Sequence, residues 1–265
     1  MKRIALLLPL LAIGCANEPT PPPASEPDTE SFAVPLETRA DSVAFRLVEA
    51  SGGFEAWDAL PVLRFEYGFE RDGQQQVAAR HYWDKHHNRY CVEWPGGEDS
   101  TYVGIFSAWP DSGQVYVNGT LLDGDAGEAA LATAHRRTIN DTYWLLAPLK
   151  VFDDGVTRSY VPDSSSATTD VIKLSFSNVG LTPGDQYWLS VDRESGRLRQ
   201  WTFVLEGNPR PLSFKWTDYY QLNGPAGPVL LSRRKERADG ATLTDQLRAL
   251  ATSDSTLFTD PQPRL

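Results

Sequence analysis

The chain has 265 residues, and its 35 acidic residues outnumber its 25 lysines and arginines, which gives a formal net charge of −10 at pH 7. A surface with this charge repels nucleic acid and anionic lipid, so we expect neither as a partner. Of the two cysteines, only Cys91 falls in the part expected to fold, which excludes an internal disulfide there. The 8 tryptophans, 10 tyrosines and 11 phenylalanines predict an aromatic-rich body dominated by strands.

An export signal is predicted for residues 1–14. Lys2 and Arg3 precede an apolar run that ends just before Gly14 and Cys15. A helix of this run would rise only about 15 Å, half of a hydrocarbon core of about 30 Å. A cleaved signal peptide is therefore favoured over a short membrane anchor.

The small residue before Cys15 resembles the lipobox of bacterial lipoproteins, in which the cysteine is diacylated and becomes the first residue after cleavage. The resemblance implies lipidation of Cys15. A non-lipidated signal peptide is the alternative, because Ala12 stands where leucine is usual. Ala16 implies the outer membrane, by resemblance to the sorting rule of diderm bacteria. Residues 15–37 contain six prolines and predict an extended tether.

Hydrophobic periodicity predicts a helix at the start of the folded part and then a series of strands. Asp41 is expected to cap a helix over residues 42–50, which Gly52 and Gly53 end. Alternating apolar residues then predict five strands separated by turns, as in an antiparallel meander. These strands cover residues 63–70, 77–83, 89–94, 101–106 and 114–118.

The pattern changes over residues 128–149, where apolar residues recur at broadly helical spacing. We expect a helical insertion here that breaks near Asn140 and Asp141 and cannot continue straight through Pro148. Six further strands bring the expected total to about eleven. They cover residues 156–160, 171–176, 186–192, 198–205, 212–221 and 229–236. The pattern predicts one α+β domain over residues 38–265, built on a large antiparallel sheet.

Several segments carry a resemblance to known proteins. They are residues 50–53 with Trp57, 140–150, 180–188 and 192–196. With the order of elements, they resemble a family of bacterial, mostly Bacteroidota-type, lipoproteins and, in fold, the LolA and LolB lipoprotein carriers and the RseB-type sensors. The resemblance covers about residues 38–250 and implies a strongly curved half-barrel sheet with a helical lid over an apolar groove. It brings no established catalytic residues, so it implies architecture rather than activity.

The chain offers few residues for catalysis or metal binding. The adjacent His86 and His87 lie in a predicted turn, where their side chains diverge rather than converge on a metal. His81 is expected to be a satisfied inward polar group, and Cys91 a small buried apolar group within a strand. We therefore expect no metal, no cofactor and no enzymatic activity. An enzyme that uses His81, His135 or Cys91 is the third alternative.

An apolar inner surface is the feature left for function. Apolar residues alternate along several strands, and residues 143–151 form the natural lid above them, with a plain core helix as the alternative. A concave apolar surface with few polar groups is the usual form of a ligand site. The predicted ligand-binding residues are Phe65, Tyr67, Phe69, Trp83, Trp94, Trp144, Leu145, Trp188 and Trp201.

The sequence thus predicts a non-enzymatic, monomeric lipoprotein of the outer membrane, with its domain facing the periplasm or exposed at the cell surface. The lipid on Cys15 provides its contact with the membrane. Its groove is expected to bind an acyl chain, a lipid or a lipoprotein. The main alternative is an interaction or sensor module of the cell envelope, whose groove is filled by its own side chains and whose partner binds outside.

Overall fold

The computed structural model describes residues 36–97, 99–107, 112–177, 184–250 and 254–265. The predicted signal peptide, Cys15 and nearly all of the tether lie outside these residues, as does part of the segment 180–188. Val34–Leu265 form one compact unit. Within the described part of the chain, no helix is both long enough and apolar enough to cross a membrane.

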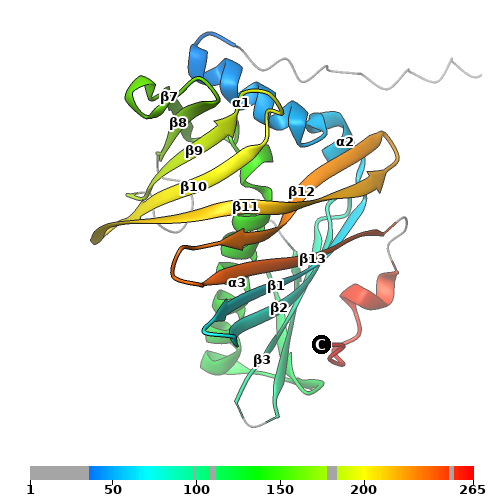
Figure 1. The fold of residues 1–265 in the computed structure, drawn as a ribbon. Coiled ribbons are helices and arrows are strands. Elements are labelled where there is room, and N and C mark those ends of the chain that lie inside the picture. Colours follow the sequence, from blue (N-terminus) through cyan, green and yellow to red (C-terminus); the bar gives the residue numbers. More distant parts are fainter. Residues whose placement is uncertain (1–35, 98, 108–111, 178–183, 251–253) are drawn as a thin grey trace, which may run out of the picture. The chain divides into compact units, whose positions relative to one another are not determined.

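A single antiparallel sheet organises the described residues (Figure 1). Its strands are β1 (Val62–Arg71), β2 (Gln74–Asp84), β3 (Arg89–Pro95), β4 (Thr101–Ser107), β5 (Ser112–Val117), β6 (Thr120–Leu121), β7 (Val156–Tyr160), β8 (Thr169–Phe176), β9 (Gln186–Asp192), β10 (Leu198–Leu205), β11 (Asn208–Gly224), β12 (Gly227–Glu236) and β13 (Thr242–Leu250). The helices are α1 (Arg39–Ala50), α2 (Gly53–Ala59), α3 (Gly124–Leu146), and the 3-10 helices η1 (Ala147–Leu149), η2 (Pro162–Ser164) and η3 (Ser255–Phe258).

The strand order is β6-β5-β4-β3-β2-β1-β13-β12-β11-β10-β9-β8-β7. Among the described residues this order has two ends, β6 and β7, so the sheet is open and does not close into a barrel. One long helix, α3, lies against one face of the curved sheet, and α1 lies near β7 and β8 (Figure 1). The predicted α+β class and the single large curved sheet with an N-terminal helix and a central helix are confirmed.

The described sheet has 13 strands, two more than the expected number of about eleven. The sequence prediction omits the two-residue β6 and the nine-residue β13. β13 lies between β1 and β12 and joins the two meanders into one sheet, with Leu247 opposite Phe65. Its apolar alternation is interrupted by Asp245, a buried carboxylate on the core side. An inward charge breaks the pattern from which strands are predicted.

α1 begins three positions before the expected helix, at Arg39, and its N-cap is Thr38 rather than Asp41. The Thr38 hydroxyl accepts a hydrogen bond of 3.1 Å from the backbone N–H of Asp41. The Asp41 carboxylate in turn accepts one of 3.0 Å from the backbone N–H of Thr38. This reciprocal capping box satisfies two backbone donors at once, which a cap at Asp41 alone would not do.

α3 runs without a break through Asn140 and Asp141, so the predicted interruption there is wrong. Both side chains find partners that leave the helical backbone undisturbed. The Asn140 amide donates to Asp141 Oδ1 at 2.8 Å, and Asp141 Oδ2 lies 3.1 Å from Nε2 of His81 on β2. The helix ends where Pro148 was expected to end it, and the chain continues as the 3-10 helix η1.

The sheet has an inner face, which packs against α3, and an outer face. Along the inner face, Ala130 and Ala134 of α3 pack with Tyr90 and Phe106, and Leu145 packs with the main core. The helix approaches β4 closely, since a Cβ atom on Gly104 would lie 3.0 Å from the Ala134 Cβ. On the outer face, η3 covers a separate small core. The buried members of that outer core are Val62, Tyr82, Cys91, Val103 and Phe258.

Candidate ligand-binding site

Aromatic side chains gather where the end of α3 faces β8, β9, β10 and β11. Strand residues contribute to this group at alternate positions, because successive side chains of a strand point to opposite faces. We call the group the aromatic cluster. It consists of Tyr143, Trp144, Phe176, Tyr187, Trp201, Phe203, Phe214 and Trp216.

Trp144 is the aromatic anchor that α3 places on this surface. Its ring centroid lies 4.5 Å from that of Trp201, 5.1 Å from that of Phe214 and 5.5 Å from that of Phe203. The side chain is half-buried, whereas the neighbouring Leu145 is fully buried. Trp144 therefore combines contacts to three rings with a part that stays accessible.

Tyr143 extends the cluster toward β8 and β9. Its ring centroid lies 5.5 Å from that of Trp201, 5.9 Å from that of Tyr187 and 6.0 Å from that of Phe176. Burial raises the pKa of the Tyr143 hydroxyl well above its usual value, so the group stays a neutral hydrogen-bond donor at physiological pH.

Three buried donors in the aromatic cluster have no hydrogen-bond partner among the described residues. They are the Tyr143 hydroxyl and the indole Nε1 atoms of Trp201 and Trp216. Trp201 links the other two, with ring centroids 5.5 Å from Tyr143 and 6.0 Å from Trp216. An unsatisfied buried donor costs about 1–3 kcal/mol, so such atoms are normally met by protein, water or a ligand. The cluster thus offers rings and polar contacts together.

A second group of inner-face residues is polar and is largely paired within itself. We call it the polar cluster, and it consists of His81, Tyr90, Asn140, Asp141, Lys235 and Asp245. His81 Nδ1 lies 3.0 Å from the Tyr90 hydroxyl, and His81 Nε2 lies 3.1 Å from Asp141. The imidazole also stacks on Phe65 at 4.3 Å with an angle of 3° between the ring planes. His81 is the satisfied inward polar group that the sequence predicts.

Lys235 and Asp245 form a fully buried ion pair inside the polar cluster. The Lys235 ammonium donates to Asp245 Oδ2 at 2.5 Å and to the backbone carbonyl of Ser232 at 2.9 Å. Burial raises the pKa of Asp245, and the attraction of Lys235 opposes that shift. Asp245 Oδ1 is the one member atom of this cluster that is buried without a partner among the described residues. The Lys235 ammonium also lies 4.8 Å from the Trp216 ring centroid, so the pair borders the aromatic cluster.

The predicted ligand-binding residues do not form one group. Trp144 and Trp201 lie in the aromatic cluster, and Leu145 is buried in the main core beside them. Phe65, Tyr67 and Phe69 line β1 at the other side of the inner face. Trp83 contacts Trp57 at 5.8 Å, and Trp94 stacks on Tyr102 at 5.2 Å.

Trp188 lies on the outer face of the sheet, so its prediction as an inward ligand-binding residue is wrong. Its neighbours Tyr187 and Leu189 pack with the inner core, and successive strand residues alternate between faces. Trp188 instead stands opposite Lys173 and Thr202, with the Lys173 ammonium 5.2 Å from its ring centroid. Because β9 carries aromatic residues at two successive positions, aromatic content alone does not reveal which one faces inward.

Five residues of the two clusters are not among the predicted site residues, namely Tyr143, Tyr187, Phe214, Trp216 and Lys235. Tyr143 lies within the predicted lid, and the others lie on predicted strands. Alternation along β11 would have found Phe214 and Trp216. No sequence signal shows that their donors lack partners, because that depends on contacts between strands distant in sequence.

Cys91 and His81, two of the three residues considered for catalysis, are held in unreactive settings. Burial raises the pKa of the Cys91 thiol to about 12, which disfavours the nucleophilic thiolate. Both His81 nitrogens are engaged, as described for the polar cluster. Within the ranges that the structure covers, no group of three or more His, Cys, Asp or Glu side chains is placed to hold a metal ion.

Three solved structures are similar to this chain. A DUF1329 family protein from Desulfovibrio piger has a TM-score of 0.46 and 8% identity, over 83% of this chain and 96% of that chain. A candidate outer membrane lipoprotein-sorting protein domain from Vibrio parahaemolyticus has a TM-score of 0.45 and 8% identity, over 82% and 95%. A LolA superfamily protein from Nitrosomonas europaea has a TM-score of 0.41 and 13% identity, over 82% and 96%. Neither a protein-family model nor a curated protein matches the sequence.

Proposed function

We propose that this protein is an envelope lipoprotein that binds the acyl chain of an amphipathic molecule at the aromatic cluster, between the end of α3 and the inner face of the sheet. The lipid on Cys15 and the tether of residues 15–37 would hold the domain at the outer membrane. The observation that carries this proposal is the presence, among aromatic rings, of three buried donors for which the described part of the chain provides no hydrogen-bond partner.

The chemistry of the cluster fits an amphipathic ligand better than a purely apolar one. Rings such as Trp144 and Phe203 offer apolar contact to a hydrocarbon chain. The donors on Tyr143, Trp201 and Trp216 offer hydrogen bonds to acceptor oxygens, such as those of a carboxylate or an ester. A ligand that supplied both would remove the cost of burying these donors.

The proposal confines binding to one part of the inner face. Phe65, Tyr67 and Trp94 are buried and pack against the rest of the protein. The inner face around β1 to β3 is therefore largely filled by the chain itself, as the sensor alternative supposes, although Phe69 and Trp83 are partly buried. Trp144, Tyr143 and Tyr187 are only partly buried, which leaves ring surface for a ligand at β9 to β11.

Native mass spectrometry of the full chain purified from its own envelope tests ligand binding. We expect a population heavier than the lipidated protein by the mass of an amphipathic molecule, and extraction with organic solvent should release that molecule. A protein that carries only its own acyl groups, and that binds no fluorescent fatty acid when one is added, would contradict the proposal.

Anchoring is tested separately by Cys15→Ser. Acylation contributes about 0.8 kcal/mol per buried CH₂, so loss of the acyl chains should move the protein from the membrane fraction to the soluble fraction. Sedimentation of the Cys15→Ser protein with membranes as complete as that of the parent would contradict lipid anchoring.

A further inference from the structure

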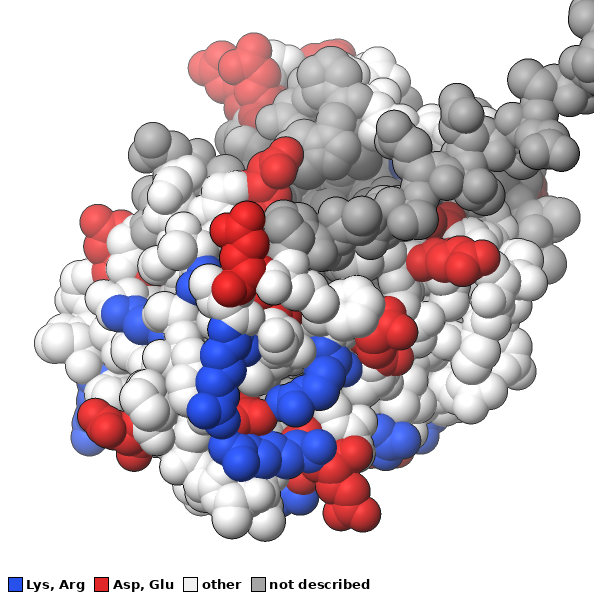
Figure 2. Space-filling view, turned by 90° about the horizontal axis from the view of Figure 1, so that it is seen from above, with Lys and Arg blue, Asp and Glu red and all other residues white. Residues whose placement is uncertain are grey.

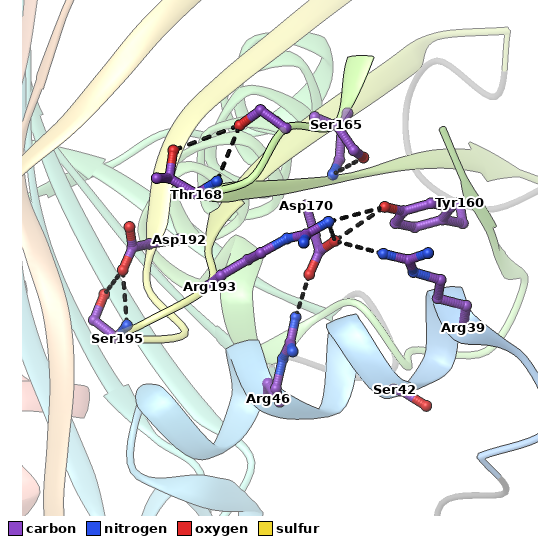
Figure 3. A network of polar contacts seen from close by, with 12 residues as sticks. Arg39, Ser42, Arg46, Tyr160, Ser165, Thr168, Asp170, Asp192, Arg193 and Ser195 are labelled. Carbon is purple, nitrogen blue, oxygen red and sulfur yellow. Dashed lines mark hydrogen bonds and ion pairs between the residues drawn. The ribbon is translucent and has the colours of Figure 1, made fainter. Parts of the chain in front are cut away.

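Three arginines surround one aspartate where α1, β8 and the turn after β9 meet (Figure 3). The Asp170 carboxylate accepts hydrogen bonds from Arg39 at 3.2 Å, Arg46 at 2.5 Å and Arg193 at 2.7 Å. The Tyr160 hydroxyl donates a fourth at 3.0 Å. We call Arg39, Arg46 and Arg193 the arginine cluster. Although burial opposes it, these hydrogen bonds hold the pKa of Asp170 below its usual value, so the carboxylate stays charged.

The arginine cluster carries more positive charge than its centre neutralises. Three guanidinium groups against one carboxylate leave two positive charges in excess. Of the other carboxylates on these elements, Asp41 already pairs with Arg158, and Asp192 pairs with Arg199. The exposed carboxylates Glu37, Glu49, Asp163 and Glu194 form no ion pair with the cluster among the described residues. The excess of positive charge is therefore confined to the arginine cluster itself, because these four carboxylates lie on or beside the same elements.

The three guanidinium groups keep donors to spare. Each reaches Asp170 through Nη2, so Nε and Nη1 of each have no protein partner among the described residues. Arg158 provides the contrast, because its Nε and Nη1 donate to Asp41 and to two backbone carbonyls. An arginine whose role is only to connect elements of the fold, such as Arg158, donates most of its N–H groups to protein acceptors.

The arginine cluster is open to solvent and fixed in place. The side chains of Arg39, Arg46 and Arg193 are 59%, 47% and 34% exposed, whereas that of Asp170 is 4% exposed. The Arg39 guanidinium also lies 3.9 Å from the ring centroid of Tyr160, which supports it from one side. The face seen in Figure 2 shows Lys and Arg side chains gathered around acidic ones at its lower part. The guanidinium groups of the arginine cluster are thus fixed in position and accessible to an anion in the solvent.

We propose that the arginine cluster docks on the phosphate groups of anionic phospholipids in the membrane that carries the tether. Guanidinium groups bind phosphate through paired hydrogen bonds. Arg39 is the first residue of α1 and follows directly on the tether of residues 15–37, so the anchor leads the chain to this end of the domain. For this face, the proposal revises the expectation that the acidic chain has no affinity for anionic lipid. It rests on the proposed anchoring at Cys15.

Vesicle binding tests the docking surface. The full chain with Cys15→Ser, which lacks acyl groups, is sedimented with phosphatidylcholine vesicles that either contain or lack phosphatidylglycerol. We expect tighter binding when phosphatidylglycerol is present. The variant with Arg39→Gln, Arg46→Gln and Arg193→Gln should lose about fivefold in binding constant per arginine, up to about a hundredfold. High salt should have the same effect on the parent.

A second triple variant controls for overall charge. Arg233→Gln, Arg234→Gln and Arg248→Gln remove the same charge from another part of the surface, on β12 and β13, and this variant should bind like the parent. Equal losses in both triple variants, or equal binding of the parent to both kinds of vesicle, would overturn the proposal. If the first triple variant does not fold, Arg39→Gln alone should still lose about fivefold. Fatty-acid binding by the same variants should stay at the parent level, so failure of docking and failure of ligand binding are distinguishable.

Discussion

The polar cluster and the aromatic cluster lie on the same inner face and both contact α3, yet they treat buried polar atoms in opposite ways. In the polar cluster, His81 and Lys235 have partners for their nitrogens, and one oxygen of Asp245 is left over. In the aromatic cluster, the donors of Trp201 and Trp216 have none among the described residues. The contacts of His81 with Asp141 indicate that the polar cluster holds α3 on the sheet, whereas the aromatic cluster keeps donors for which the described residues provide no acceptor.

The largest expected effect comes from breaking the polar cluster at its ion pair. Lys235→Met leaves the Asp245 carboxylate buried without its cation, which should lower the free energy of unfolding by about 3–5 kcal/mol in a urea titration. The double variant Lys235→Met with Asp245→Leu replaces both charges and should be considerably more stable than the single variant. A single variant as stable as the parent would remove the structural role assigned to this cluster.

The next effect concerns Trp144, the anchor of the aromatic cluster. Trp144→Ala should weaken binding of a fluorescent fatty acid by about 1 kcal/mol or more, while stability falls by less than the roughly 3–5 kcal/mol expected for a core tryptophan. Trp188→Ala, on the outer face, is the matched control and should leave fatty-acid binding unchanged. If Trp144→Ala instead costs several kcal/mol of stability and binding is retained, Trp144 belongs to the core alone.

A smaller and sharper test removes one hydroxyl from each cluster. Tyr143→Phe deletes a donor that has no partner among the described residues, so stability should be unchanged or rise, and fatty-acid affinity should fall by about 0.5–1.5 kcal/mol. Tyr90→Phe deletes the partner of His81, so it should cost about 1–3 kcal/mol of stability and no affinity. If the two variants behave alike, the contrast between the clusters fails.

The smallest expected effect lies outside the inner face, at Asp170. Its carboxylate pairs with the exposed side chains of the arginine cluster. The pKa of Asp170 is lowered in the folded protein from the ordinary aspartate value of 3.8, so its stabilising contribution is present above that value. The contribution is lost as the pH falls below about 4 toward the folded-state pKa. Asp170→Asn should therefore be less stable than the parent by about 0.2–1 kcal/mol at pH 7, a gap that should close in acid. A gap that persists unchanged at low pH would show that the contribution is not ionic.

The sequence was sufficient for the main architecture, because the sheet is built from regularly alternating strands and from one helix of clear periodicity. It was insufficient where a polar side chain finds its partner far along the chain. The apolar alternation of β13 is interrupted by Asp245. This carboxylate can face the core because Lys235 of β12 pairs with it. Asn140 and Asp141 resemble a helix break, yet His81 on a distant strand satisfies Asp141. Such pairings exist only in the folded chain.

The candidate site was predictable in part for a similar reason. Large apolar residues on strands and lid point to an inner surface, which places Trp144 and Trp201 correctly on it. The same pattern predicts a site over the whole inner face, because it does not distinguish Tyr67, which is buried, from Tyr187, which is partly exposed. Packing between elements far apart in sequence decides that question.

The junction between β12 and β13 has a mechanical consequence. β13 pairs with β1 over nine residue pairs but with β12 over only three, from Arg234 with Thr244 to Glu236 with Thr242. Beyond this short ladder, the two strands separate. The two halves of the sheet are thus joined by a short ladder of three residue pairs, which contains Lys235 of the Lys235–Asp245 ion pair. Apart from the edge pair of β5 and β6, this ladder has the fewest residue pairs in the described sheet, so bending the sheet here would disturb the fewest backbone hydrogen bonds between interior strands.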